Sequence, residues 1–260
     1  MQRVLIVEDN IRVQQVLKHI AAQYLDVLVD FASSLTQCKQ LLSQTSYSLA
    51  LVDLPLSGQN DMNVARYILS QGIPTLLMTT QLEESTRLKM LELGIIDYII
   101  KDNRDSYLYA IKFVAQLLRN QGRKALVVDN SLLSSSLVKQ MLEKQLFDVI
   151  TADNSAQALH ILNHNRAIKL VITNHNLTDM NGFELIRAIR NVKSREQLAI
   201  IGLADVYSYG VATQFIKSGA NDFLTKPFTH EEFHFRVVKT MESLWLGEAI
   251  RADLSLDATE

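Results

Sequence analysis

The sequence has few of the residues that cross-link or stiffen a chain. Its 260 residues include one cysteine, Cys38, and three prolines. A single cysteine excludes an intramolecular disulfide, and this usage is typical of a protein in a reducing compartment. Cys38 lies in an apolar-periodic stretch, so we interpret it as a small buried core residue.

Long apolar runs and a strong charge of one sign are also absent. No apolar run approaches the roughly 18 residues of a membrane span, and acidic residues begin too early for a secretory signal. The net charge of −2 excludes a strongly basic nucleic-acid surface as the main function. With 48% hydrophobic residues the composition is globular, and we expect a cytoplasmic protein without membrane or direct nucleic-acid binding.

What the sequence does contain is an internal repeat, because the opening VLIVEDN returns as ALVVDNS. Early landmarks in the two copies are 121 residues apart: Asp9 with Asn130, and Asp53 with Asn174. Later landmarks are 125 residues apart: Thr79 with Ala204, Gly94 with Gly219, and Lys101 with Lys226. The extra residues fall in the polar stretch NVKSREQL, so the chain holds two copies of one domain with one loop insertion.

Each copy alternates strand patterns with helix patterns. The first copy has five short apolar runs: RVLIV, DVLV, LALVD, TLLMT and DYII. Near-continuous apolar runs indicate a parallel sheet covered on both faces. Helix-length segments with a spacing near 3.6 residues, such as 11–24, lie between them. The pattern predicts two tandem doubly wound α/β domains, each with five strands and five helices.

The domain boundaries are predicted from a short polar junction. The stretch LLRNQGRK contains Gly122, which suits a helix end. We expect domains at 1–121 and 122–245, closely coupled, and a helical extension or linker at 246–260.

Polar residues follow the predicted strands of the first copy. Glu8 and Asp9 end the first strand, Asp53 the third, Thr79 the fourth and Lys101 the fifth. Functional groups gather at the carboxyl ends of strands in an open parallel sheet. Converging carboxylates need a cation, and Mg²⁺ prefers oxygen ligands. A carboxylate beside Mg²⁺ can attack a phosphoryl donor, while the lysine offsets the developing charge and the threonine hydroxyl bonds a phosphoryl oxygen.

This constellation resembles the receiver domain of two-component response regulators, over both copies from about Arg3 to Lys239. The resemblance implies a flavodoxin-like (βα)5 fold, Mg²⁺ as cofactor, and a sensor histidine kinase or phosphotransfer protein as partner. It also implies these roles: Asp53 as phosphoacceptor; Glu8, Asp9, Asp53 and the backbone carbonyl of Pro55 as metal ligands; Thr79 and Lys101 as contacts of the acyl phosphate; and Thr79 and Tyr98 as switch residues.

Taken singly, these residues have ordinary interpretations. A lone aspartate at a strand end is a turn or capping residue, a lone lysine is solvated, and Tyr98 alone is a half-buried core aromatic. The copy also departs from the family's usual pattern. Asp102 and Ser57 stand at two positions where the family usually has proline. A cis bond before a non-proline residue costs ~3 kcal/mol, so we expect a trans bond before Asp102.

The second copy keeps the predicted fold pattern but lacks most of the functional side chains. Asn174 stands at the acceptor position, and a neutral amide cannot form an acyl phosphate. Asn130 leaves Asp129 as the only carboxylate, and Ala204 replaces the switch hydroxyl, although Lys226 persists. The second copy is therefore predicted to be a non-phosphorylatable adaptor that is kept for its surfaces.

The C-terminal segment from Thr229 has a helical pattern that exceeds a normal fifth receiver helix. It either caps the domain and frays, or is a signalling helix that leads to an output domain. A competent receiver followed by a degenerate one resembles the N-terminal half of diguanylate cyclase response regulators, an analogy of architecture only.

Two function classes stay open. The first is a regulator that accepts phosphate on itself and signals by repacking of its receivers or by homodimerisation. The second is a phosphorylation-independent scaffold that only binds partners. The intact acceptor constellation favours the first, and a metal-dependent hydrolase ranks behind both for want of a general base or a substrate-pocket signature.

Overall fold

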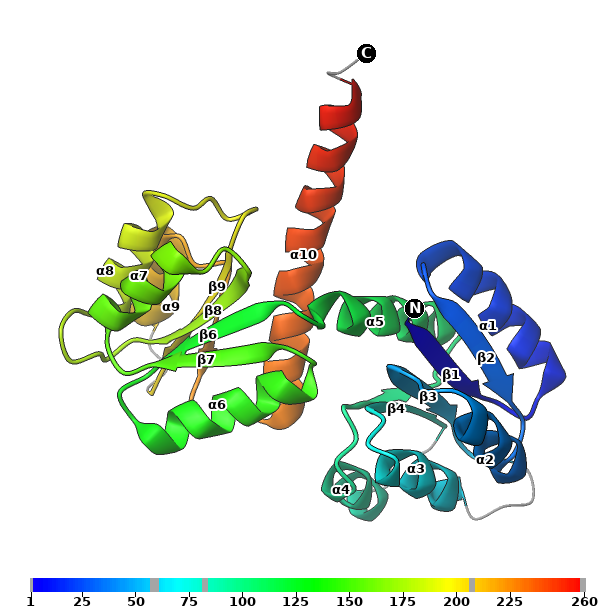
Figure 1. The fold of residues 1–260 in the computed structure, drawn as a ribbon. Coiled ribbons are helices and arrows are strands. Elements are labelled where there is room, and N and C mark those ends of the chain that lie inside the picture. The colour runs from blue at the N-terminus through cyan, green and yellow to red at the C-terminus, as the bar shows by residue number, and fades with distance from the viewer. Residues whose placement is uncertain (1, 57–60, 81–83, 206–208, 258–260) are drawn as a thin grey trace. The chain divides into compact units, whose positions relative to one another are not determined.

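A computed structural model describes residues 2–56, 61–80, 84–205 and 209–257. The chain divides into two compact units, Met1–Leu118 and Arg119–Glu260, called unit 1 and unit 2 below. Each unit is a parallel five-stranded sheet flanked by helices (Figure 1). None of the helices within the described ranges is both long and apolar enough to cross a membrane.

Unit 1 has the strand order β2-β1-β3-β4-β5, and all of its strand pairs are parallel. Its strands are β1 (Arg3–Val7), β2 (Leu28–Ala32), β3 (Leu49–Asp53), β4 (Thr75–Thr79) and β5 (Tyr98–Ile100). Its helices are α1 (Ile11–Tyr24), α2 (Leu35–Gln44), α3 (Asp61–Ser70), α4 (Glu84–Glu92) and α5 (Asp105–Asn120).

Unit 2 repeats this order as β10-β9-β8-β6-β7, read from the opposite edge. Its strands are β6 (Lys124–Val128), β7 (Asp148–Ala152), β8 (Ile168–Asn174), β9 (Ala199–Ala204) and β10 (Asp222–Thr225). Its helices are α6 (Leu132–Lys144), α7 (Ser155–His164), α8 (Gly182–Arg190), α9 (Tyr209–Ser218) and α10 (His230–Asp257). The predicted pair of doubly wound, flavodoxin-like α/β domains is confirmed.

The core of each unit follows from strand alternation. In β6, Ala125 and Val127 join a cluster with α6 and α10, whereas Leu126 and Val128 join one with α7, α8 and α9. Both faces of this sheet are therefore covered by helices, which explains the continuous apolar runs in the sequence.

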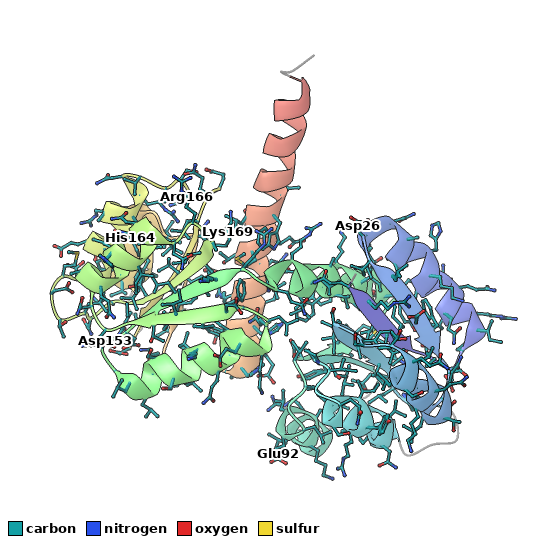
Figure 2. The ribbon with its side chains drawn as sticks, in the orientation of Figure 1. Asp26, Glu92, Asp153, His164, Arg166 and Lys169 are labelled. Atoms are coloured by element: carbon teal, nitrogen blue, oxygen red, sulfur yellow. The ribbon has the colours of Figure 1, made fainter. Side chains whose placement is uncertain are left out.

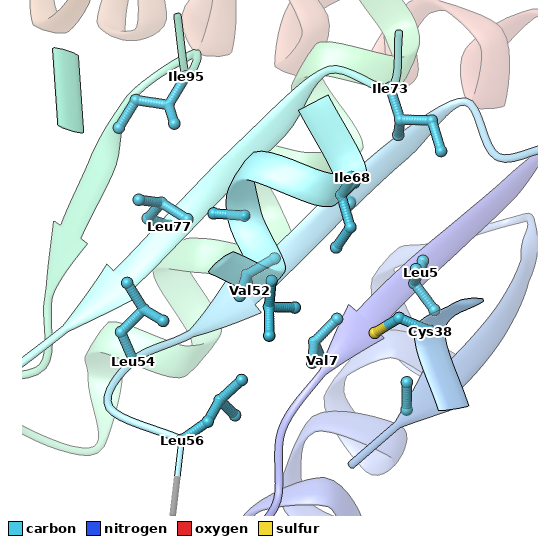
Figure 3. Close-up of a cluster of buried hydrophobic side chains, with 14 of the residues drawn as sticks. Leu5, Val7, Cys38, Val52, Leu54, Leu56, Ile68, Ile73, Leu77 and Ile95 are labelled. Carbon is cyan, nitrogen blue, oxygen red and sulfur yellow. The ribbon is translucent and has the colours of Figure 1, made fainter. Parts of the chain in front are cut away.

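Cys38 contributes to the equivalent core of unit 1. Figure 3 shows this cluster, in which residues of β1, β3 and β4 pack with α2 and α3. The Cys38 side chain is completely buried, and burial raises the pKa of its thiol to about 11. The interpretation of Cys38 as a core residue is confirmed.

The second strand lies two residues later than its predicted start. The run at 26–29 suggested the strand, but β2 begins at Leu28. β2 is an edge strand and is only partly buried, so it includes Asp30, which interrupts the apolar pattern. Arg3 pairs with this carboxylate at 2.6 Å, and the Tyr47 hydroxyl donates to it at 3.0 Å.

The domain junction predicted at 121/122 lies just past the end of α5. Gly122 has the positive φ of 75° expected just past a helix end, but the units separate earlier, inside α5. The buried Asn120 side chain belongs to unit 2, where its amide donates to the Gln145 carbonyl at 3.0 Å. At the other predicted boundary, 245/246, α10 continues without interruption.

We expect two stacked histidines, His230 and His234, to make the stability of unit 2 sensitive to pH. His234 is 2% exposed in α10, and burial, followed by the charge of His230, lowers its pKa to about 3. The unfolded chain protonates this imidazole below about pH 6.5, whereas the folded chain does not. Stability should therefore be full above pH 6.5 and fall on acidification toward pH 3 by on the order of 1 kcal/mol per pH unit.

Urea unfolding at pH 7.5 and pH 5.5 measures this loss. His234→Gln should flatten the pH dependence, whereas His160→Gln, at an exposed position, should preserve it. If the free energy of unfolding changed equally with pH in wild type and His234→Gln, the pH dependence could not be assigned to His234.

Candidate functional site

The predicted residues of unit 1 gather at the carboxyl edge of its sheet. Backbone hydrogen bonds hold the strand ends in place: Glu8 N donates to Ala32 O at 2.9 Å, Leu54 N to Met78 O at 2.8 Å, and Lys101 N to Thr79 O at 2.8 Å. The strand ends that carry Glu8, Asp53, Thr79 and Lys101 therefore lie side by side, as sequence reasoning predicted.

Asp53 is the centre of this group. Its carboxylate accepts a hydrogen bond from the Lys101 ammonium, and the two side chains are only 7% and 12% exposed. Glu8 is buried beside Asp53, and Asn10 N donates to its Oε1 at 2.7 Å. Burial, and then the interaction with Asp53, raises the pKa of Glu8 to about 8. The edge therefore holds two neighbouring buried carboxyl groups and one partly buried cation.

The carboxyl groups at this edge are not arranged as a preformed metal cluster. Within the described ranges, no three His, Cys, Asp or Glu side chains lie close enough to hold a metal. Two observations explain this: the Lys101 ammonium already balances the charge of Asp53, and burial favours the neutral form of Glu8. Asp9 follows Glu8 and is half-buried.

The donor chemistry nevertheless suits Mg²⁺. The Glu8 Oε2 atom is buried and has no hydrogen-bond partner among the described residues. Such an oxygen is an available ligand for a hard cation, whose charge would displace the proton that the raised pKa keeps on Glu8. Glu8, Asp9 and Asp53 are the side chains that would hold it.

The remaining predicted positions surround this group. Thr79 is 5% exposed, and Tyr98 is half-buried against the unit 1 core cluster. Pro55 is exposed and follows a cis Leu54–Pro55 bond. The bond before Asp102 is trans, as predicted. Ser57 lies outside the described residues.

Sequence reasoning missed two side chains that reach the site from helices. The pKa of Tyr107 in α5 is raised by burial and then by the charges of Asp53 and Glu8. Gln14 in α1 donates to the Glu8 carbonyl at 2.5 Å. Neither residue follows a strand, and strand ends were the only signal that the sequence offered.

Unit 2 reproduces the frame of this site. Asp129 N donates to Ala152 O at 3.1 Å, His175 N to Leu203 O at 2.7 Å, and Lys226 N to Ala204 O at 2.7 Å. These bonds join the same strand ends as in unit 1, with Asn174 at the position of Asp53. Asn174 and Ala204 are buried and Asn130 is exposed.

Hydrogen bonds from four donors surround the carboxylate of Asp129. Lys226 Nζ donates to Oδ2 at 3.0 Å and Ser134 Oγ to the same oxygen at 2.6 Å. Asn174 Nδ2 donates to Oδ1 at 3.2 Å and Ser131 N at 2.9 Å. The side chain of Asp129 is completely buried, so this network compensates its charge without a metal.

The family model of the response regulator receiver domain matches residues 4–112 and again residues 125–238. The chain belongs to the response regulator receiver domain family. Its two matches correspond to unit 1 and unit 2, so both units are receiver domains.

Individual proteins agree with this assignment. A chemotaxis protein CheY homolog of Campylobacter jejuni is 33% identical over 107 residues, which span 41% of this chain and 82% of that protein. Chemotaxis protein CheY1 of Helicobacter pylori is 30% identical over 107 residues, covering 41% of this chain and 86% of that protein. A solved structure named as a putative two-component system response regulator/GGDEF domain protein is 35% identical, with a TM-score of 0.85 over 94% of this chain and 99% of that chain.

Proposed function

We propose that unit 1 accepts a phosphoryl group on Asp53 from a histidine kinase or phosphotransfer protein, and that unit 2 is a non-phosphorylatable adaptor. The observation that carries the proposal is the buried contact between Asp53 and Lys101, beside Glu8 and at the same sheet edge as Thr79. This arrangement combines a nucleophilic carboxylate with a cation that can stabilise the negative charge on the phosphoryl oxygens during transfer.

Transfer then needs few steps from the protein. An Asp53 carboxylate oxygen attacks the phosphorus of the donor's phosphohistidine, the phosphorus–nitrogen bond breaks, and the imidazole leaves with the electron pair. Lys101 turns from the carboxylate toward the phosphoryl oxygens, and the Thr79 hydroxyl donates to one of them. Glu8, Asp9, Asp53 and the Pro55 carbonyl would hold Mg²⁺, which would supply positive charge to offset that of the phosphoryl group.

The adaptor role of unit 2 is supported by its site chemistry. Asn174 is a poor nucleophile, and the Asp129 carboxylate is already satisfied by Lys226, Ser134 and Asn174. Two similar solved structures are named as response regulator/GGDEF domain proteins, which supports a diguanylate cyclase as the output that the receivers control.

Stoichiometry tests this proposal. Intact-mass measurement after acetyl phosphate treatment should show one added phosphoryl group per chain, and only with Mg²⁺ present. Uptake of two groups would show that unit 2 also accepts a phosphoryl group. Uptake in the presence of excess chelator would contradict the requirement for Mg²⁺.

The intramolecular signal is expected to depend on Thr79 and Tyr98. Phosphorylation adds about −1.5 to −2 charge at the sheet edge, and the Thr79 hydroxyl can move toward it. The half-buried Tyr98 can then turn inward and change the surface of β5 and α5, whose last residues belong to unit 2. We therefore expect the receivers to repack or the chain to dimerise.

Small-angle scattering and sedimentation with and without beryllofluoride measure this change. Wild type should differ between the two states, and Thr79→Ala should lose most of the difference. Thr75→Ala is the control, because Thr75 is buried at the opposite end of β4. Identical profiles for ligand-bound and ligand-free wild type would exclude switching by this chain alone.

A phosphorylation-independent scaffold remains the second candidate. Its support is a set of exposed apolar side chains beside the two site edges, namely Ile11 at 71%, Leu132 at 80% and Leu133 at 84% exposure. They follow β1 and β6 at the N-termini of α1 and α6. Partner binding that is unchanged by beryllofluoride would favour this function.

A further inference from the structure

A pocket of about 230 Å³ opens at the amino edge of the unit 2 sheet, opposite the Asp129–Asn174 edge. It lies where the segment before β8 meets the inserted loop 191–198 before β9. Its polar lining includes Asn165, Arg166, Lys169, Lys193, Glu196 and Gln197. Figure 2 shows Arg166 and Lys169 near one another and apart from Asp153, which follows β7 at the carboxyl edge.

Positive charge dominates this pocket. Three of the lining side chains are cations and one, Glu196, is an acid. Lys169 and Lys193 are half-buried and Arg166 is exposed, and no ion pair of Arg166 or Lys193 is found among the described residues, whereas Lys169 and Glu196 each have another interaction. Partial burial lowers the local dielectric constant around the two lysines and strengthens their attraction for an anion.

The repeat supplies an internal comparison. Unit 1 has a pocket of about 460 Å³ at the matching place, between 42–47 and 71–73. Its lining lies entirely within the described residues and contains no charged side chain. Thr45 stands there at the position of Arg166, and Lys193 comes from the loop that is longer in unit 2. The cationic character is therefore specific to the pocket of unit 2, the unit with Asn174 at the position of Asp53.

Arg190 holds the loop that brings Lys193 to the pocket. Its guanidinium donates to the carbonyls of Lys193, Ser194 and Leu198 at 3.3, 3.1 and 2.9 Å. The same group donates to Gly219 O and Asn221 Oδ1, both at 2.8 Å. Burial lowers the pKa of Arg190 to about 10, so it remains a cation at neutral pH. A loop fixed in this way loses little further entropy when a ligand binds.

We propose that this pocket binds a small phosphate-bearing anion, either free pyrophosphate or the diphosphate group of a nucleotide. Three cations in a pocket of this size suit a compact ligand with several charges. Arg166 offers a planar fork for two phosphate oxygens, and Lys169 and Lys193 offer point charges. Unit 2 would then bind a ligand at the amino edge of its sheet, independently of phosphoryl transfer in unit 1.

Calorimetric titration of the full chain with pyrophosphate, at low ionic strength, tests the proposal. Wild type should bind one equivalent, and Arg166→Gln and Lys193→Gln should each weaken binding by on the order of tenfold, because each removes one charge-assisted contact. Lys217→Gln is the matched control, because Lys217 is exposed on α9 and lies outside the pocket lining. Asp53→Asn should bind as wild type does, which separates this site from phosphoryl transfer.

A second titration with ADP distinguishes the two sources of the ligand. Binding of ADP with the same dependence on Arg166 and Lys193 assigns a nucleotide, and binding of pyrophosphate alone assigns the free anion. Absence of binding for both probes, or equal affinities in wild type and both pocket variants, would overturn the proposal.

Discussion

Asp53→Asn should abolish phosphoryl uptake from acetyl phosphate, and Lys101→Met should slow it by on the order of 100-fold. The asparagine amide is neutral and cannot form the acyl phosphate, so its effect is complete. Lys101 contacts the Asp53 carboxylate in a largely buried setting, where loss of one compensating charge has a large effect on the rate.

Intact-mass time courses with saturating Mg²⁺ measure both effects. The matched controls are Asp26→Asn and Lys89→Met, which change the same residue types at exposed positions away from the site. Circular dichroism of each variant separates lost chemistry from lost folding. Phosphoryl uptake that persists in Asp53→Asn would assign the acceptor to another residue.

Restoring two carboxylates to unit 2 should create a Mg²⁺ site there. Asn130→Asp and Asn174→Asp, combined in an Asp53→Asn background, are expected to raise Mg²⁺ affinity by on the order of 100-fold. Asp129 alone cannot supply the ligand charge that Mg²⁺ needs, and hydrogen bonds from Lys226, Ser134 and Asn174 already surround its oxygens. Asn174→Asp removes one of these donors and adds a ligand at the same edge.

Mg²⁺ titration followed by calorimetry measures the gain. Asn163→Asp with Asn191→Asp adds the same charge at exposed positions outside the site and should leave the affinity low. Tight Mg²⁺ binding by unit 2 before the substitutions would contradict the interpretation of the Asp129 network as a substitute for the metal. Unchanged affinity in the restored variant would show that Lys226 continues to neutralise the site.

The strands and the overall topology could be predicted because their causes are local. Each buried strand is a short continuous apolar run, and the second copy repeats the order of the first. β2 was misplaced because an edge strand tolerates Asp30, whose partners, Arg3 and Tyr47, come from distant positions. The buried contact between Asn120 and Gln145 could not be predicted, because no local pattern relates these two residues.

The candidate site was predictable to the extent that it is built from strand ends. Parallel strands bring their carboxyl ends to one edge, so Glu8, Asp53, Thr79 and Lys101 could be grouped from the sequence. Their predicted roles remain to be tested by the experiments above. Tyr107 could not be found in this way, because it approaches from a helix and no spacing relates it to the strand ends.

By itself, the sequence determined that this protein is a pair of α/β domains, with Asp53 in the first where the second has Asn174. The residue type at this position is enough to distinguish the two domains, since an amide cannot replace a carboxylate as nucleophile. Only the tertiary structure decided how the charges are balanced: Asp53 by Lys101, and Asp129 by a four-donor network. The cationic pocket also needed the fold, because Arg166 and Lys193 become neighbours only when the inserted loop packs beside β8. Electrostatic interactions depend on distance and burial, and long-range packing sets both.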